Sequence, residues 1–311
     1  FFKSEALMFE LVMSMATEAM GLAGSGADAC TAGKFTEASR HLKAAAGVMK
    51  YLAEDQLPKW LSRGVNVDEK TMPAEASAGI CDAFHILFLA IGQQMVVSNV
   101  LTKPGTPNYM LLAKLCLGTS EHLEQFASTM RTKASVQKQR MDPSFFSLVA
   151  FQIAFQRSLS MYFQARGVWD THEHYGLAIS MLSEATVLLR TRESMTARGI
   201  PDVDSSKTKL KPLSKDLTDL RNHMQILLRS WETDNSTVYF ESVPQSVPDD
   251  QRIKKGIMML KPDPYILIEP EPLPLSLPEH STSSMSAEKP PVTRERSDSD
   301  LARDLDKMWN K

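Results

Sequence analysis

Apolar residues recur at intervals of three and four over most of the first 236 positions, which is the spacing of one face of an α-helix. The pattern is clearest from Tyr175 onward, where the apolar positions are Tyr175, Ala178, Ile179, Leu182, Ala185 and Leu189. No stretch sustains a period of two, so the sequence predicts an all-α protein. The predicted helices cover about 2–20, 35–62, 74–102, 107–131, 143–167, 175–189 and 213–232.

Glycine and proline mark the predicted breaks between these helices. The glycine-rich stretch 21–26 ends the first helix, 104–107 separates the third from the fourth, and Pro143 starts the fifth. Connections this short favour antiparallel neighbours. The segments around Ala38 and Ala178 resemble the entry helices of tetratricopeptide hairpins, but no fixed ~34-residue period holds. We therefore predict irregular tetratricopeptide-like stacked hairpins.

The composition changes after Thr237. Residues 238–244 look β-like, and the prolines of 261–278 exclude a helix although the apolar residues between them favour burial. An extended strap over 238–278, laid along the helices, satisfies both constraints. The same prolines suit the groove of an SH3 or WW domain, so binding in trans is an alternative.

Residues 279–311 are rich in serine, lysine and glutamate and predict a disordered tail, with one short helix at 301–309. Ser297 and Ser299 are each followed by an aspartate, which is typical of an acidic-directed phosphosite. The helical domain and its strap are therefore predicted to span 1–278.

Charge and residue usage exclude several classes of function. Lys+Arg 35 against Asp+Glu 37 gives a net charge of −2, which argues against a nucleic-acid binder. The three cysteines are far apart and lack CxxC spacing, so neither a disulfide framework nor a zinc site is predicted, and a reducing compartment fits. His172 and His174 are two apart and do not share a helix face, so we expect no metal there.

No catalytic or membrane motif emerges from the sequence. It contains no phosphate loop, nucleophile elbow or metalloprotease motif, so we expect neither an enzyme nor a bound cofactor. The most apolar run, 80–91, is interrupted by Asp82 and His85 and is shorter than the ~20 residues of a membrane helix, so no membrane span is predicted.

Three stretches carry a family resemblance. Residues 2–9 read FKSEALMF, residues 45–52 read AAGVMKYL and residues 234–244 read DNSTVYFESVP. They resemble the K-S-x-x-L-F, A-x-G-x-F-x-x-L and N-D-x-I-Y-x-x-x-V-P signatures of the BRO1 domain, the banana-shaped helical module of Alix-like endosomal scaffolds. The resemblance covers roughly 1–278. The family's opening elements are missing, which predicts an N-terminally truncated member.

The resemblance implies an adaptor that binds the C-terminal amphipathic helix of an ESCRT-III subunit (a charged multivesicular body protein) on an apolar concave patch. Carried over by position, that patch falls on Val96, Leu111 and Leu115. Val96 stands where a bulky aromatic residue is usual, and Ala32 and Thr36 replace a flanking acidic/basic pair. Periodicity alone does not separate a groove from an interior, so the same three residues also fit the core.

The resemblance also bears on location and regulation. It implies a cytoplasmic protein, peripheral at endosomes through its partners, because the chain ends without the prenylation signal of some BRO1-only proteins. A rhophilin-type signalling scaffold that binds small-GTPase pathway proteins is the alternative function. Tyr239, in the third signature, is either an aromatic anchor for the strap or a phosphosite.

Overall fold

The computed structural model describes residues 7–62, 72–189 and 211–268, and these ranges contain helices and irregular backbone but no β-strand. The predicted all-α class is therefore confirmed. The chain divides into two compact units, Phe1–Ile266 and Leu267–Lys311, and every described helix belongs to the first. The predicted tail, with Ser297, Ser299 and the helix at 301–309, lies outside the described residues, as does 269–278 of the predicted strap.

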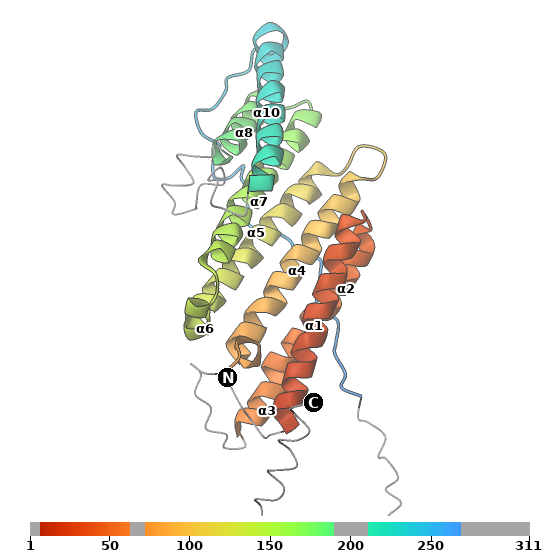
Figure 1. Ribbon diagram of the computed structural model, residues 1–311. Helices are drawn as coiled ribbons and strands as arrows, with labels where there is room; N and C mark the ends of the chain where they lie inside the picture. The colour runs from red at the N-terminus through yellow and green to blue at the C-terminus, as the bar shows by residue number, and fades with distance from the viewer. Residues whose placement is uncertain (1–6, 63–71, 190–210, 269–311) are drawn as a thin grey trace, which may run out of the picture. The chain divides into compact units, whose positions relative to one another are not determined.

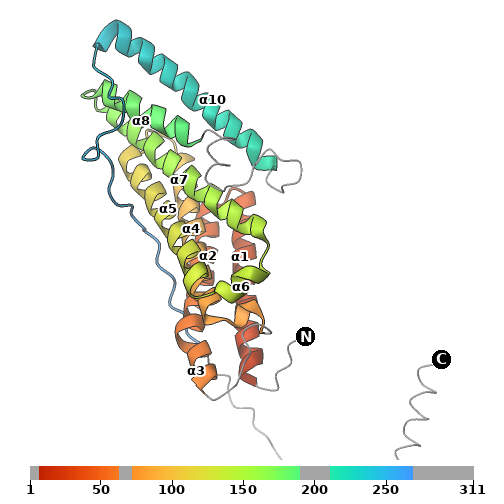
Figure 2. The same cartoon turned by 90° about the vertical axis from the view of Figure 1, so that its left-hand side faces the viewer.

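The long helices pack on one another mostly in chain order (Figures 1 and 2). Helix α1 packs on α2, α2 on α4, α4 on α5, α5 on α7, α7 on α8 and α8 on α10. The elements are α1 (Leu7–Thr31), α2 (Phe35–Tyr51), the π-helix η1 (Leu52–Gln56), α3 (Leu57–Ser62), the 3-10 helix η2 (Ala74–Ala76), α4 (Ala78–Leu101), α5 (Tyr109–Thr132), α6 (Ser135–Arg140), α7 (Pro143–Asp170), α8 (Tyr175–Leu188), α10 (Lys211–Asp234) and the π-helix η3 (Asn235–Tyr239).

The apolar stripes seen in the sequence form the buried interfaces between these helices. Leu123 and Phe126 of α5 meet Leu87 of α4 in one cluster, and Leu182 of α8 meets Met224 of α10 in another. All five side chains are buried. Helix-to-helix packing of apolar stripes therefore stabilises the fold, as the periodicity predicts.

The predicted end of the first helix at 21–26 is wrong, because α1 continues to Thr31. A Cβ atom at Gly26 would lie 3.1 Å from the Leu42 side chain and 3.3 Å from the Ala38 carbonyl oxygen. This glycine serves close contact between α1 and α2, and the backbone around it stays helical.

The β-like interpretation of the residues after Thr237 is also wrong at its start. Helix α10 continues directly into the π-helix η3, which ends where Phe240 adopts a left-handed conformation (φ 54°). The Asn235 side chain then bonds both backbone groups of Glu241, donating to its oxygen at 2.9 Å and accepting from its nitrogen at 3.1 Å. These bonds fix the turn out of the helix. The short helix α6 was not predicted at all.

Residues 241–266, here called the extended arm, contain no helix or strand and run across several helices. The Gly176 nitrogen of α8 donates to the Glu241 carboxylate at 2.9 Å. Further along, the Ile257 nitrogen donates to the Lys114 oxygen of α5 at 2.9 Å, and the Asp263 nitrogen donates to the Lys43 oxygen of α2 at 3.3 Å. The arm thus contacts α8, α5 and α2 in turn.

Two helices, α1 and α4, are long and apolar enough to cross a bilayer by length and composition alone. This finding differs from the sequence prediction, in which no segment is long enough to span a membrane. In α4, 61% of the apolar window is buried within the protein, against 22% in α1. A core helix of a helical bundle passes the same test as a membrane helix, so this finding is weak evidence for a membrane span.

Candidate partner-binding surface

Val96 lines a hollow of about 260 Å³ between α2 and α4, here called the α2–α4 hollow. Its apolar walls are Val96 and the half-buried ring of Phe35, and Arg40 stands exposed at its edge. Lys43, also at the edge, pairs with Asp263 of the extended arm at 2.9 Å. The hollow is therefore a small apolar depression with a basic rim. Its residues are Phe35, Thr36, Ser39, Arg40, Lys43, Val96 and Asn99.

Leu111 lies on the surface, in the first turn of the neighbouring helix α5, and is 37% exposed. It does not line the α2–α4 hollow. Leu101, at the end of α4, and Met110, at the start of α5, are exposed as well. They lie at the same end of the helix pair, because the loop 102–108 that joins the two helices is short. Val96 and Leu111 thus belong to adjacent helices near one end of the bundle, with exposed apolar side chains around Leu111.

Leu115 is a core residue with 1% exposure, so it does not face a guest helix as the family resemblance implies. It packs with Leu112, Cys116 and Phe163 in a cluster that Ile253 of the extended arm helps to cover. Leu111 and Leu115 do share a helix face by spacing. Leu115, however, lies one turn deeper, where α4, α7 and the arm close over that face.

Tyr239 packs the end of η3 against α7 and α8. Its ring stacks on Tyr175 with centroids 3.5 Å apart and meets Trp169 edge-on at 5.9 Å. Trp169 in turn stacks on Trp231 of α10 at 4.2 Å. Burial raises the pKa of the Tyr175 phenol, and the neighbouring Tyr239 hydroxyl raises that pKa further. These contacts fit an aromatic anchor, and both the anchor role and the phosphorylation of Tyr239 stay predictions.

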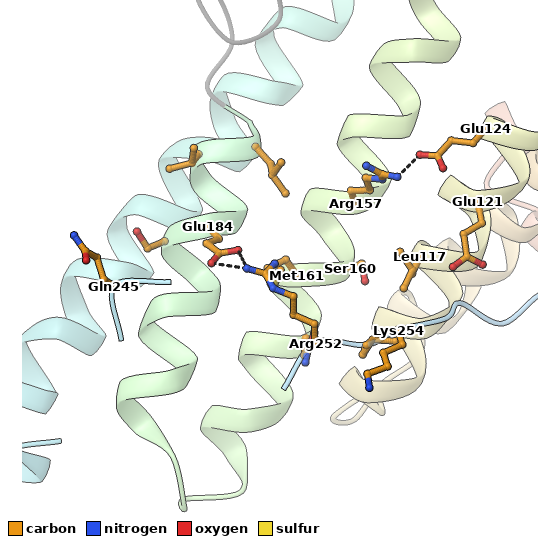
Figure 3. A pocket seen from close by; sticks show the side chains of 15 residues that line it. Leu117, Glu121, Glu124, Arg157, Ser160, Met161, Glu184, Gln245, Arg252 and Lys254 are labelled. Atoms are coloured by element: carbon orange, nitrogen blue, oxygen red, sulfur yellow. Dashed lines mark hydrogen bonds and ion pairs between the residues drawn. The ribbon is translucent and has the colours of Figure 1, made fainter. Parts of the chain in front are cut away.

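Another hollow, of about 670 Å³, lies between α5, α7, α8 and the extended arm (Figure 3). Two ion pairs stand on its walls: Glu184 with Arg252 of the arm at 2.8 Å, and Glu124 with Arg157. This hollow could not be predicted from the sequence, because its walls come from segments that are far apart in the chain. Its apolar lining consists of Leu117, Met161, Val187, Leu188 and Ile253.

Within the described ranges, no three His, Cys, Asp or Glu side chains are grouped so that they could hold a metal ion. Burial raises the pKa of the Cys81 and Cys116 thiols to about 12, so neither is a thiolate near neutral pH. What the surfaces offer is shape, apolar area and charge.

Comparison with known proteins identifies the family. The profile of the BRO1-like domain matches residues 9–289. The chain belongs to the BRO1-like domain family. This is a family of non-catalytic adaptor domains. The family suspected from the three sequence signatures is thus confirmed.

Solved BRO1 structures share the fold at low sequence identity. A Bro1 domain described as the structure basis for endosomal targeting matches with a TM-score of 0.65 and 16% identity over 84% of this chain and 64% of that one. ALIX in complex with the SIVmac239 PYKEVTEDL late domain matches with a TM-score of 0.56 and 14% identity over 78% of this chain and 29% of that one. The ALIX BRO1–CHMP4C complex matches with a TM-score of 0.55 and 15% identity over 75% of this chain and 56% of that one.

The BRO1-like chain therefore spans less than two thirds of the length of each of these structures. No curated protein matches its sequence. At these identities the structural likeness establishes a shared fold.

Proposed function

We propose that this BRO1-like protein is a non-enzymatic adaptor that binds the C-terminal amphipathic helix of an ESCRT-III subunit in endosomal sorting. Two findings support the proposal: the family, and the fold shared with the ALIX BRO1 domain that was solved with CHMP4C. The observation that carries it in this chain is the α2–α4 hollow, with Val96 in its wall and Leu111 exposed on the next helix.

The size of the hollow suits a side chain of a docked helix. Its volume of about 260 Å³ is below the ~300–1,000 Å³ typical of small-molecule sites. An amphipathic helix would place one apolar side chain against Phe35 and Val96, and others over Leu111. An acidic residue on the same helix would approach Arg40 at the exposed edge. Leu115 supports this surface from beneath and does not touch the guest.

The extended arm holds one edge of this surface in place. The Lys43 carbonyl oxygen accepts a hydrogen bond from the Asp263 nitrogen, and the Lys43 ammonium pairs with the Asp263 carboxylate. Nearby, the Tyr265 ring packs at a tilt of 47° against Tyr51, with the ring centroids 5.3 Å apart, and the Tyr265 hydroxyl donates to Glu18 at 2.9 Å. An SH3 or WW domain would have to remove these contacts to reach the prolines beside Tyr265. They therefore favour binding of this part of the arm in cis.

The proposed location follows from the proposed partner. A domain that recruits ESCRT-III acts on the cytoplasmic face of endosomes and reaches the membrane through its partners. The Bro1 structure described for endosomal targeting supports this location at the level of the family.

The experiment is a fluorescence-anisotropy titration of the full chain against a labelled ESCRT-III C-terminal helix. Leu111→Asp should weaken binding by about thirtyfold, roughly 2 kcal/mol. Leu111 is the third residue of α5, where an acidic side chain favours the helix N-terminus, so this variant should fold. Ile226→Asp, at a 68% exposed position on α10, is the matched control and should bind normally.

Two outcomes would contradict the proposal. One is the absence of saturable binding by the unmodified chain to any ESCRT-III helix. The other is an equal loss of binding in Leu111→Asp and Ile226→Asp, which would mean that the α4–α5 end has no special role.

A further inference from the structure

A second hollow, of about 440 Å³, lies where α5 ends, α6 intervenes and α7 begins. One side is apolar and one is cationic. The Phe146 ring carries the Lys138 ammonium 5.2 Å from its centroid, and Arg131 stands exposed in the last turn of α5. The described residues that line it are Arg131, Ser135, Lys138, Gln139, Met141, Pro143 and Phe146.

The charge of this hollow has one sign. Among the described residues no carboxylate lines it, and the ten residues 131–140 contain four cations and no acid. Two of the four have partners elsewhere: Lys133 pairs with Asp82 at 2.6 Å, and Arg140 donates to the Met72 oxygen at 2.7 Å. Arg131 and Lys138 pair with no carboxylate among the described residues. The two cations that line the hollow are thus available to a ligand.

We propose that this hollow, here called the basic hollow, binds an acidic linear peptide that carries an apolar side chain between its carboxylates. The carboxylates would pair with Arg131 and Lys138, and the apolar side chain would pack on Met141, Pro143 and Phe146. The Ser135 hydroxyl and the Gln139 amide supply further donors for the peptide backbone. Such a ligand complements both the charge and the apolar wall.

The concave geometry favours a peptide over a membrane surface. A membrane-inserting site presents protruding apolar side chains, whereas Met141 and Phe146 are half-buried in the wall of the hollow. A recessed apolar wall accommodates a single side chain, which a peptide offers and a flat bilayer does not.

The basic hollow is independent of the proposed ESCRT-III surface. Leu111 and Arg131 lie on the same helix, α5, roughly 30 Å apart at 1.5 Å per residue. Figure 1 shows α6 at the end of α5 and α7 that is remote from the α4–α5 loop. Both ligands could therefore be bound at once, which would let one domain join an acidic partner to an ESCRT-III subunit.

The test uses the full chain and a fluorescein-labelled peptide in which glutamates flank a single phenylalanine. The unmodified protein should bind it, more weakly as salt is raised. Lys138→Glu should reduce the affinity about tenfold or more, and Lys138→Arg should retain it. Lys103→Glu, the same charge reversal in the loop after α4, is the matched control and should bind normally.

Three results would overturn the proposal: no saturable binding to the unmodified chain, equal loss in Lys138→Glu and Lys103→Glu, or equal binding of a peptide with glutamine in place of glutamate. Binding to phosphatidylserine vesicles without binding to the peptide would also overturn it, in favour of a membrane contact. Because Lys138→Arg keeps the charge and the packing, its behaviour separates loss of the ligand contact from misfolding. An added ESCRT-III helix should leave this binding unchanged, so failure here is distinguishable from failure of the ESCRT-III proposal.

Discussion

Gln93 and Met259 are 166 positions apart in the chain and are joined by a hydrogen bond of 2.8 Å from the Met259 nitrogen to the Gln93 side-chain oxygen. The same side chain donates to the Ile257 oxygen at 2.8 Å and to the Leu115 oxygen at 2.8 Å. Gln93 is completely buried. One amide in α4 therefore holds both the extended arm and helix α5.

Replacing Gln93 by methionine should destabilise the protein, because the substitution keeps the side-chain length but leaves buried backbone groups without partners. The free energy of unfolding should fall by about 1–3 kcal/mol for each group left unpaired, measured by urea denaturation. The matched control is Gln94→Met, since Gln94 is half-buried and its bond among the described residues is a 3.5 Å contact with Gln152. Equal stability of the two variants would contradict the role given to Gln93.

Gly118→Ala should destabilise the protein as well, because a Cβ atom there would lie 2.4 Å from the Ile257 oxygen. Either α5 or the extended arm would have to shift. Gly24→Ala, in α1, has nothing within 4 Å and should instead stabilise the helix by up to about 1 kcal/mol. Thermal unfolding of the two variants should therefore move in opposite directions, and movement in the same direction would count against a close arm contact.

The cysteines should differ in reactivity. Burial raises the pKa of the Cys81 and Cys116 thiols to about 12, whereas Cys30 is partly exposed. Iodoacetamide at a mildly alkaline pH should modify Cys30 alone in the folded protein and all three after denaturation. Peptide mass spectrometry measures this directly. Rapid modification of Cys116 in the native state would show that α5 is less well covered than described.

Acid should destabilise the fold through two histidines. Burial lowers the pKa of His85, against the opposing influence of Asp82 3.6 Å away, and burial likewise lowers the pKa of His122. The unfolded chain then binds more protons below its histidine pKa of about 6.5, so stability is complete above that pH and falls as the pH drops below it.

The corresponding measurement is the urea midpoint followed from about pH 7.5 to pH 5. The midpoint should fall with pH in the unmodified protein. The double variant His85→Gln with His122→Gln should flatten the dependence in this range. An unchanged slope in the double variant would assign the acid sensitivity to other groups.

Much of the helical architecture could be predicted because each helix has its own local apolar pattern. The spacing after Tyr175 placed α8 almost to the residue, and the loop prolines placed the boundary between α4 and α5. The end of α1 was predicted too early because the sequence does not reveal whether a glycine breaks a helix or lets a neighbouring helix approach. Gly26 does the latter, against Leu42.

The candidate site was only partly predictable, because exposure depends on segments distant in sequence. Val96 lines a hollow, and Leu111 lies on the surface. Leu115 has the same spacing and type as Leu111, yet α4, α7 and the arm bury it. The basic hollow could not be predicted either, since Arg131, Lys138 and Phe146 line one hollow only after α6 folds between α5 and α7.

The most direct test of the adaptor proposal places a bimane fluorophore at Asn99→Cys, at the edge of the α2–α4 hollow, in a Cys30→Ser background. An ESCRT-III C-terminal helix with a tryptophan on its apolar face is then titrated in. We expect saturable quenching at position 99 and none from the same label at Asn222→Cys on the exposed side of α10, as the adaptor proposal requires. Binding without quenching at position 99, or equal quenching at both positions, would contradict it.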